Sequence, residues 1–299
     1  MGVQVLVGDV RTQLRCTEAQ ARHLHHLLGA LPLADGPVAS WIEVVEDDVV
    51  TPAWTEPGDV QVTVDGAMAD VVHSSGGWAR VVDGRATITV GRGTGPVALR
   101  RLFSVALAFA IGPQDRTLLH GGAVAAGPGA VLVLGPSGAG KSTVVVAALA
   151  HGRRAWSDDL LVARGAGAGL EVAGLPRPLA VGPEVVEQLG LAAAPEDEGR
   201  GRTLLSPGCF EDGWVPLVGA VVVGHGDRSH VERVGAAAAL PALVGAHLAG
   251  WSPELLGRWY PHAAAMARGA TWSLTHDPDP APRLAALPAL LEQLDQDVD

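Results

Sequence analysis

A glycine-rich segment in the middle of the chain, Gly135–Ser142, constrains the fold more than any other feature of the sequence. It reads Gly-Pro-Ser-Gly-Ala-Gly-Lys-Ser and fits the pattern GxxxxGK[ST], whose backbone N–H groups wrap around a phosphate. An apolar, β-rich run, 130–134, precedes it, and an apolar run of helical length, 143–150, follows it. The pattern predicts a strand, a phosphate-binding loop and a helix within an α/β fold. A plain glycine-rich turn that happens to match the pattern is the alternative.

The chemistry of this segment predicts a nucleotide ligand. Glycines let the backbone turn several N–H groups toward an anion, and the start of the helix adds a partial positive charge. Lys141 would neutralise phosphate oxygens, and the Ser142 hydroxyl would ligate Mg²⁺. We therefore expect ATP and Mg²⁺ to bind here, and the candidate binding residues are Gly135, Pro136, Ser137, Gly138, Ala139, Gly140, Lys141, Ser142 and Thr143.

Two adjacent acids follow at a position that suits this ligand. Residues 154–157 can form the strand after the helix, so Asp158 and Asp159 would end that strand. In parallel α/β units, ligands bind outside the carboxyl ends of the strands. One carboxylate can hold Mg²⁺, and the other can accept a proton from an attacking hydroxyl. A pair of acids on a surface turn is the alternative.

His120 is a third candidate in the same part of the chain. It precedes a run, 122–126, that can form a strand paired with the strand before the glycine-rich loop. From there its imidazole could donate a hydrogen bond to phosphates, although a lone histidine is more often structural than catalytic.

Taken together, these residues resemble the catalytic domain of HPr kinase/phosphorylase and its wider family of kinases. The match is firm over 118–161, where the offsets of His120 and Asp159 from Lys141 agree with the family without a gap. A looser match continues through 174–178, 203–207 and a predicted strand at 218–223.

The resemblance implies a role for each matched residue. Asp159 would be the general base, Asp158 would support it or the metal, and His120 and Lys141 would complete the catalytic group. The family also has a metal-binding Glu further along the chain. A count without gaps reaches Glu184, with Glu171 as the competing position.

The chain departs from the family in two places. The family has an acid where this chain has Thr143, and its later segment associated with phosphorolysis has no recognisable counterpart. HPr as substrate and dephosphorylation as a second activity therefore do not carry over. Related kinases phosphorylate Ser in ribosomally made peptides, so the acceptor hydroxyl could belong to a protein, a peptide or a small molecule.

Several charged residues have a weaker claim to the site. Arg200 and Arg202 lie in a glycine-rich, acidic stretch, where one could fold over the phosphates, although solvated loop charges are the favoured interpretation. Arg177, between two prolines, is interpreted in the same way. Three histidines near residue 25 have no neighbouring Cys or acid pair at metal-motif spacing, so we expect no metal there.

The first 95 residues differ in pattern from the rest. They contain β-rich runs at 3–7, 41–45, 60–64, 78–82 and 86–90, with one helix around 17–28. Pro96 then opens a helix to about residue 111, which Gly112-Pro113 ends. We expect a small α+β domain at 1–95, a candidate for substrate recognition, and a kinase-like domain at 96–299. The acidic residues 292–299 are expected to form a solvated end.

Composition limits the partners of the chain. Its 299 residues carry a formal net charge of −11, which disfavours nucleic acid and anionic membranes. Its two cysteines exclude a disulfide-built scaffold and suit a reducing compartment. We see no signal peptide and expect a cytoplasmic protein, with a homo-oligomer as an open possibility.

The sequence thus favours an ATP-dependent kinase that phosphorylates a Ser or Thr type of hydroxyl. A nucleotide-dependent ATPase or binding module that makes no transfer to an acceptor is the main alternative. A carboxykinase-like enzyme is a weaker one, because the chain lacks the other motifs of those enzymes.

Overall fold

The computed structural model describes residues 2–28, 32–48, 60–92, 94–167, 169–175, 177–191, 196–197, 202–205, 207–276 and 280–296. It is a mixed α/β protein whose strands form a seven-stranded sheet, a nine-stranded sheet and a small three-stranded sheet. The chain divides into two compact units. The first contains 1–118 and 248–256, and the second contains 119–247 and 257–299. We expected a boundary near residue 95, and the first unit continues beyond it.

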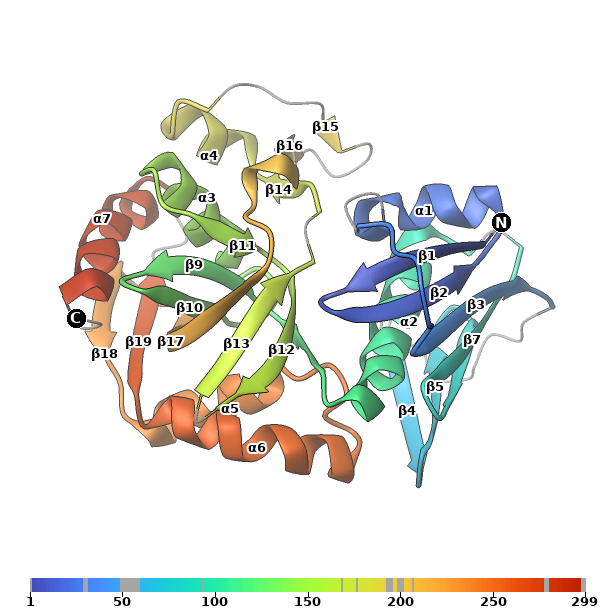
Figure 1. Ribbon diagram of the computed structural model, residues 1–299. Helices are drawn as coiled ribbons and strands as arrows, with labels where there is room; N and C mark the ends of the chain where they lie inside the picture. The colour runs from blue at the N-terminus through green and yellow to red at the C-terminus, as the bar shows by residue number, and fades with distance from the viewer. Residues whose placement is uncertain are drawn as a thin grey trace. The chain divides into compact units, whose positions relative to one another are not determined.

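The first unit is built on the seven-stranded sheet, whose order is β1-β2-β3-β7-β6-β5-β4 (Figure 1). Pairs β2–β3 and β3–β7 are parallel, and the other pairs are antiparallel. Its strands are β1 (Gly2–Val7), β2 (Val10–Arg15), β3 (Ser40–Glu46), β4 (Val60–Asp65), β5 (Met68–His73), β6 (Trp78–Val82) and β7 (Arg85–Val90).

Strands β2 and β5 are absent from our sequence prediction. Residues 10–15 alternate buried and exposed, but four of the six side chains are polar or charged, so no apolar run marks the strand. The turns that precede them do carry a signal, because Gly8 and Gly66 have positive φ values of 64° and 56°. The five strands that the sequence predicted in this region are confirmed within a residue at each end.

One face of this sheet packs against helix α2 (Pro96–Ile111), which in turn contacts α1 (Glu18–Leu28). Pro96 begins α2 as predicted, and Leu99 and Leu102 are fully buried in it. Counted with the short 3₁₀ turn η1 (Gly112–Gln114), this helix is long and apolar enough to cross a membrane. However, 67% of it is buried, as expected for the core helix of a domain.

The second unit contains most of the nine-stranded sheet, with the order β11-β9-β10-β17-β13-β12-β8. Strand β19 also pairs with β17, and β18 pairs with β19. Strands β10, β17 and β19 are parallel, whereas β9 runs antiparallel to β10. The strands are β8 (Thr117–His120), β9 (Gly122–Ala126), β10 (Gly129–Leu134), β11 (Ala155–Ser157), β12 (Leu160–Ala166), β13 (Gly169–Gly174), β17 (Trp214–His225), β18 (His230–Arg233) and β19 (Ala270–His276).

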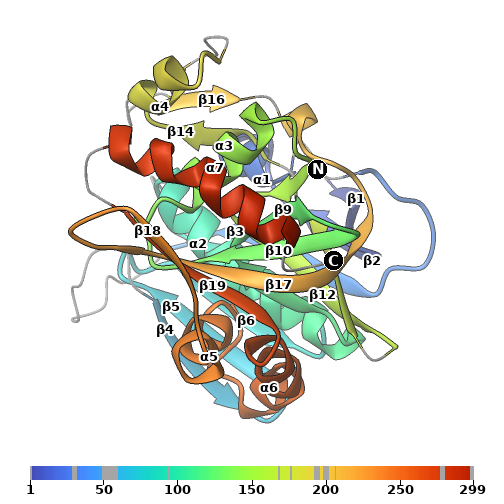
Figure 2. The same ribbon diagram turned by 90° about the vertical axis from the view of Figure 1, so that its left-hand side faces the viewer.

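Helices cover both faces of the parallel part of this sheet. Figure 2 shows α3 (Lys141–Ala150) and α7 (Pro280–Gln296) on one face, and α5 (Ala236–Gly245) and α6 (Pro253–Ala267) on the other. The core between α3, α7 and the sheet is aliphatic and centres on Val131, Val145 and Val221. The remaining elements are α4 (Pro183–Gln188), η2 (Pro207–Cys209), and the small sheet of β14 (Leu179–Val181), β16 (Arg202–Leu205) and β15 (Glu196–Asp197).

The C-terminal segment differs from our expectation of a solvated acidic end. Residues 292–296 belong to α7, and the leucines at 287, 290, 291 and 294 of this helix are buried. Their spacing places them on one helical face, and burying that face against the core outweighs the acidic character of the segment. Residues 297–299 lie outside the described part of the chain.

His247 gives this fold a testable dependence on pH. The residue is 6% exposed, bridges Leu119 through the backbone, and burial lowers the pKa of its imidazole from 6.5 to about 4. The unfolded chain therefore binds a proton that the folded chain excludes, so stability falls as the pH drops from about 6.5 toward 4. For His247 alone the expected loss between pH 7.5 and 5 is about 2 kcal/mol.

The measurement is urea unfolding at both pH values for the wild type and for His247→Gln. The variant should lose this part of the pH dependence, because glutamine does not titrate. An equal pH dependence in the two proteins would contradict the assignment.

Candidate active site

The glycine-rich loop, residues 135–140, connects the end of β10 to the start of α3, as the sequence predicted. Three of its glycines, Gly135, Gly138 and Gly140, have φ values of 145°, 82° and 97°. These values lie in the region that residues with a Cβ rarely adopt, so glycine is required by conformation. A Cβ at Gly135 would also overlap the carbonyl oxygen of Val223 in β17. The loop therefore lies directly against the neighbouring parallel strand.

A buried histidine from a distant part of the chain packs against the last residue of the loop. His276 ends β19, is fully buried, and its Nε2 atom would lie 2.7 Å from a Cβ placed on Gly140. Because β10, β17 and β19 are parallel, their carboxyl ends meet at one edge of the sheet, which brings His276 to the loop. The sequence analysis did not identify His276, and only knowledge of the strand order could have done so.

Lys141, the first residue of α3, directs its ammonium group back into the loop. Its Nζ atom donates hydrogen bonds to the carbonyl oxygens of Gly135 at 2.9 Å and Pro136 at 3.1 Å. The residue is 8% exposed, and burial lowers its pKa, an effect that Asp159 and Asp158 partly offset. A positive charge is thus held among loop carbonyls at the point where the loop meets the helix.

The two acids lie where the sequence predicted, at the end of β11, and the backbone fixes them there. The amide of Gly121 donates to the carbonyl of Asp159 at 2.8 Å, which ties this end of β11 to the start of β9. The Ser142 hydroxyl, in the first turn of α3, donates to Asp158 Oδ2 at 2.8 Å. The Asp158 side chain is 1% exposed, and burial raises its pKa, against the effect of Arg177.

The pKa of Asp159 is shifted in the opposite direction. Its Oδ1 atom lies 3.3 Å from His120 Nε2 and 3.1 Å from Arg177 Nη2. Burial alone would raise its pKa, but Arg177 and His120 together lower it to about 2. At neutral pH this carboxylate is therefore ionised and able to accept a proton or a hydrogen bond.

Arg177 joins this group, although the sequence analysis favoured a solvated loop charge for it. The residue lies in the connection between β13 and β14, and its Nε atom is 3.7 Å from Asp158 Oδ1. Its side chain is only 22% exposed, and it is the cation shared by both acids. The two prolines beside Arg177 in the sequence do not indicate this pairing with the acids. The pairing depends on where the β13–β14 connection crosses the edge of the sheet.

The acids suit a divalent cation. Asp158 Oδ1 is buried and has no hydrogen-bond partner among the described residues, while its other oxygen holds the Ser142 hydroxyl. Hydroxyl and carboxylate oxygens are ligands that Mg²⁺ accepts. Glu184 lies exposed in the first turn of α4, and its carboxylate folds over Gly182. Within the described residues, no group of three or more His, Cys, Asp or Glu is placed to hold a metal.

The other residues of our prediction occupy different positions. Ser137 is exposed in the loop, Ala139 is fully buried in the core, and Thr143 is 8% exposed in the first turn of α3. Glu171 pairs with Arg164 at 2.8 Å, away from the acids at 158 and 159. The backbone of Arg202 pairs with Asp197 in the small sheet, whereas Arg200 and the Arg202 side chain lie outside the described part.

The comparisons with known proteins give little further information. No protein-family model matches the chain, and no curated protein matches it. Among solved structures, the chain is similar to the Hpr(Ser) kinase/phosphatase from Coxiella burnetii, with a TM-score of 0.30 and 12% sequence identity. The match covers 59% of this chain and 87% of that one. A TM-score this low carries no argument about fold or function.

The loop geometry predicts different effects for two glycine substitutions. Both glycines have positive φ, so alanine is strained at either position. The Cβ of Gly140→Ala would also meet the His276 ring, whereas the Cβ of Gly138→Ala would lie in open space. Both should lose about 1–2 kcal/mol to backbone strain, and only Gly140→Ala should lose more through the overlap.

Thermal unfolding and the affinity for a fluorescent ATP analogue would measure the two effects. We expect the lower melting temperature and the weaker binding for Gly140→Ala. Equal losses in the two variants would mean that the His276 contact does not shape the loop.

Proposed function

We propose that this protein is an ATP-dependent kinase that transfers the γ-phosphoryl group to a hydroxyl of a protein, a peptide or a small molecule. The observation that carries the proposal is the grouping of an ionised carboxylate, Asp159, with His120 and Arg177 beside Asp158, Ser142 and Lys141. The resemblance of the sequence to the HPr kinase/phosphorylase family supports the same activity. We also propose that the protein is located in the cytoplasm.

In this proposal the glycine-rich loop binds the phosphates of ATP. The amides of the loop and of the first turn of α3 donate hydrogen bonds to phosphate oxygens. The Lys141 ammonium exchanges its bonds to the Gly135 and Pro136 carbonyls for bonds to the phosphates. Its partial burial makes each such bond stronger than it would be in water. Arg177 supplies a second cation within reach of the same region.

Ser142 and Asp158 would hold Mg²⁺, because they present a hydroxyl, a carboxylate and one oxygen with no hydrogen-bond partner. The ion would neutralise phosphate charge and orient the transferred group. Glu184 remains a candidate ligand from the sequence, and its exposed position on α4 requires movement of that helix for it to take part.

Asp159 is the proposed base for the acceptor hydroxyl. Its pKa of about 2 describes the free protein, where Arg177 and His120 both stabilise the anion. Bound phosphates bring negative charge and compete for Arg177, and both effects raise the pKa of Asp159 toward a useful value for proton transfer. His120 positions the carboxylate through the contact of its Nε2 atom with Oδ1.

A transfer assay with γ-labelled ATP tests the proposal. The label is followed in a size-fractionated extract of cells that express the protein, with Lys141→Ala as the control. Label in a macromolecular or small-molecule fraction, absent from the control, is the expected result. Label released only as inorganic phosphate would overturn the kinase proposal in favour of an ATPase or binding module.

Asp159→Asn should separate binding from transfer. The variant keeps the shape of the site but removes the proton acceptor, so transfer should fall about 10²- to 10⁴-fold while ATP still binds. Isothermal titration with ATP and the labelled assay measure the two properties. A variant that retains transfer would exclude Asp159 as the base.

Arg177→Gln should shift the pH profile of the reaction. Removing the guanidinium raises the pKa of Asp159 toward its ordinary value of 3.8, so the acidic limb of kcat/KM should move to higher pH. Arg164→Gln is the matched control, because Arg164 pairs with Glu171 and not with the two acids. An acidic limb at the same pH in all three proteins would contradict the coupling of Arg177 to Asp159.

A further inference from the structure

The seven-stranded sheet of the first unit presents one face on which no helix among the described residues of this unit packs. Helix α2 packs on the face formed by buried residues such as Ile42, Val81 and Ile88. The strand register places the alternate residues on the opposite face. One row across this face contains Gln13, Trp41, Arg85, Val82 and Met68, and the next contains Arg15, Glu43, Thr87, Arg80 and Asp70.

Trp41 in β3 lies between two arginines on this face. The guanidinium carbon of Arg15 is 5.6 Å from the Trp41 ring centroid, and that of Arg85 is 5.5 Å from it. Stacking on the ring holds each planar guanidinium in place through a cation–π interaction. We call this group the Arg-Trp-Arg cluster.

The two arginines of the cluster have no carboxylate within ion-pair distance among the described residues. Arg80, on the same face, differs from them, because its Nε and Nη2 atoms donate to the two carboxylate oxygens of Asp70 at 2.7 and 2.9 Å. The guanidinium of Arg80 thus already donates to both oxygens of one carboxylate, whereas the guanidiniums of Arg15 and Arg85 still offer N–H donors. Three arginines and two acids, Glu43 and Asp70, thus lie in these two rows, which leaves one positive charge in excess on this face of a chain whose net charge is −11.

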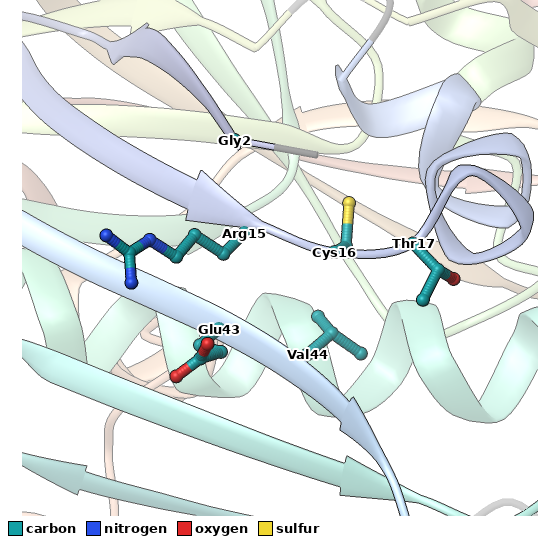
Figure 3. Close-up of a pocket in the computed structure, with 6 residues that line it drawn as sticks. All are labelled: Gly2, Arg15, Cys16, Thr17, Glu43 and Val44. Atoms are coloured by element: carbon teal, nitrogen blue, oxygen red, sulfur yellow. The ribbon is translucent and has the colours of Figure 1, made fainter.

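Two surface hollows accompany the cluster. One of about 400 Å³ is lined by Gly2, Arg15, Cys16, Thr17, Glu43 and Val44. Figure 3 shows Arg15 extending from the end of β2, with Glu43 on the neighbouring strand and the Cys16 thiol pointing away from Glu43. The other, of about 460 Å³, is lined by Trp78, Arg80, Val82, Asp83, Arg85 and Thr87. Arg15 lines the first hollow and Arg85 the second, so the cluster joins them.

We propose that this sheet face is a docking surface for an acidic peptide segment. Arg15 and Arg85 would each bind a carboxylate of the peptide through paired N–H donors, the geometry in which guanidinium and carboxylate fit best. Trp41 and Val82, which is 40% exposed, would contact apolar side chains between the acids. A role of this surface in selecting the phosphoryl acceptor rests on the proposed kinase activity. The binding of a peptide to this surface does not depend on that activity.

A peptide fits this surface better than a nucleic acid. Single-stranded nucleic acid binds to grooves that are positive along their length, and the same face here carries Glu43 and Asp70. The formal charge of −11 also opposes a polyanion at long range more strongly than a short peptide with few acids. The surface therefore suits a ligand with a few spaced carboxylates.

The test is binding of a short fluorescein-labelled peptide of alternating Glu and Val, measured by fluorescence anisotropy without ATP. Arg15→Ala and Arg85→Ala should each weaken binding about tenfold, because each loses charge-assisted hydrogen bonds. Arg80→Ala is the matched control on the same face and should change the affinity less, since its fork is engaged by Asp70. Arg85→Lys, which keeps the charge and loses the fork, should fall between the wild type and Arg85→Ala.

Equal affinity in the wild type and the two alanine variants would overturn the proposal, as would tighter binding of an oligothymidine of matching length than of the peptide. Circular dichroism and thermal unfolding verify that each variant is folded. Because the binding assay needs no nucleotide, peptide binding together with label released only as inorganic phosphate in the γ-labelled ATP assay would contradict the kinase proposal alone. Transfer to a peptide that does not require Arg15 or Arg85 would contradict the docking surface alone.

Discussion

The pairing of one arginine, Arg177, with two neighbouring carboxylates organises the candidate site. Asp158 and Asp159 follow a short strand at the edge of the sheet, and the side chain of Asp158 is 1% exposed while that of Asp159 is 24% exposed. Low dielectric makes an uncompensated charge costly at such a position. The surroundings of the two acids differ. Arg177 and His120 stabilise the charge of Asp159, whereas burial works against the charge of Asp158, which takes a hydrogen bond from Ser142. Two residues with the same side chain thereby acquire different pKa values and different chemical capacities.

The same electrostatics explain the state of the free site. Lys141 bonds to loop carbonyls, Ser142 bonds to an acid, and Arg177 pairs with both acids. The ammonium of Lys141 and the hydroxyl of Ser142 thus already donate to the protein itself, and Arg177 is held by its ion pairs. Binding of a nucleotide is therefore an exchange of partners, and the net free energy gained is the difference between phosphate contacts and the protein contacts that they replace.

Local patterns made part of this site predictable. The glycine-rich loop, its flanking strand and helix, and the strand before Asp158 depend on turn chemistry and on apolar periodicity within a few residues. For Arg177 a solvated loop charge was the favoured interpretation, and His276 was missed, because each reaches the site through strand order, which no short pattern encodes. The strand at 10–15 was missed for a related reason, since four of its six side chains are polar or charged and their place in the sheet depends on partners far along the chain.

Strand β10 begins at Gly129 and is followed by Gly135, and a Cβ at either glycine would meet a carbonyl oxygen of β17, from Pro216 and Val223 respectively. Between these two points of close approach β17 has one residue more than β10, and a register shift beside Ala130 and Val131 accommodates it. A residue inserted between 129 and 135 would shift the register of β10 against β17 again and would displace the loop from the end of β17. Insertions during evolution should accordingly collect at turns such as Gly66 and Gly84, while the segment from 129 to 135 keeps a constant length.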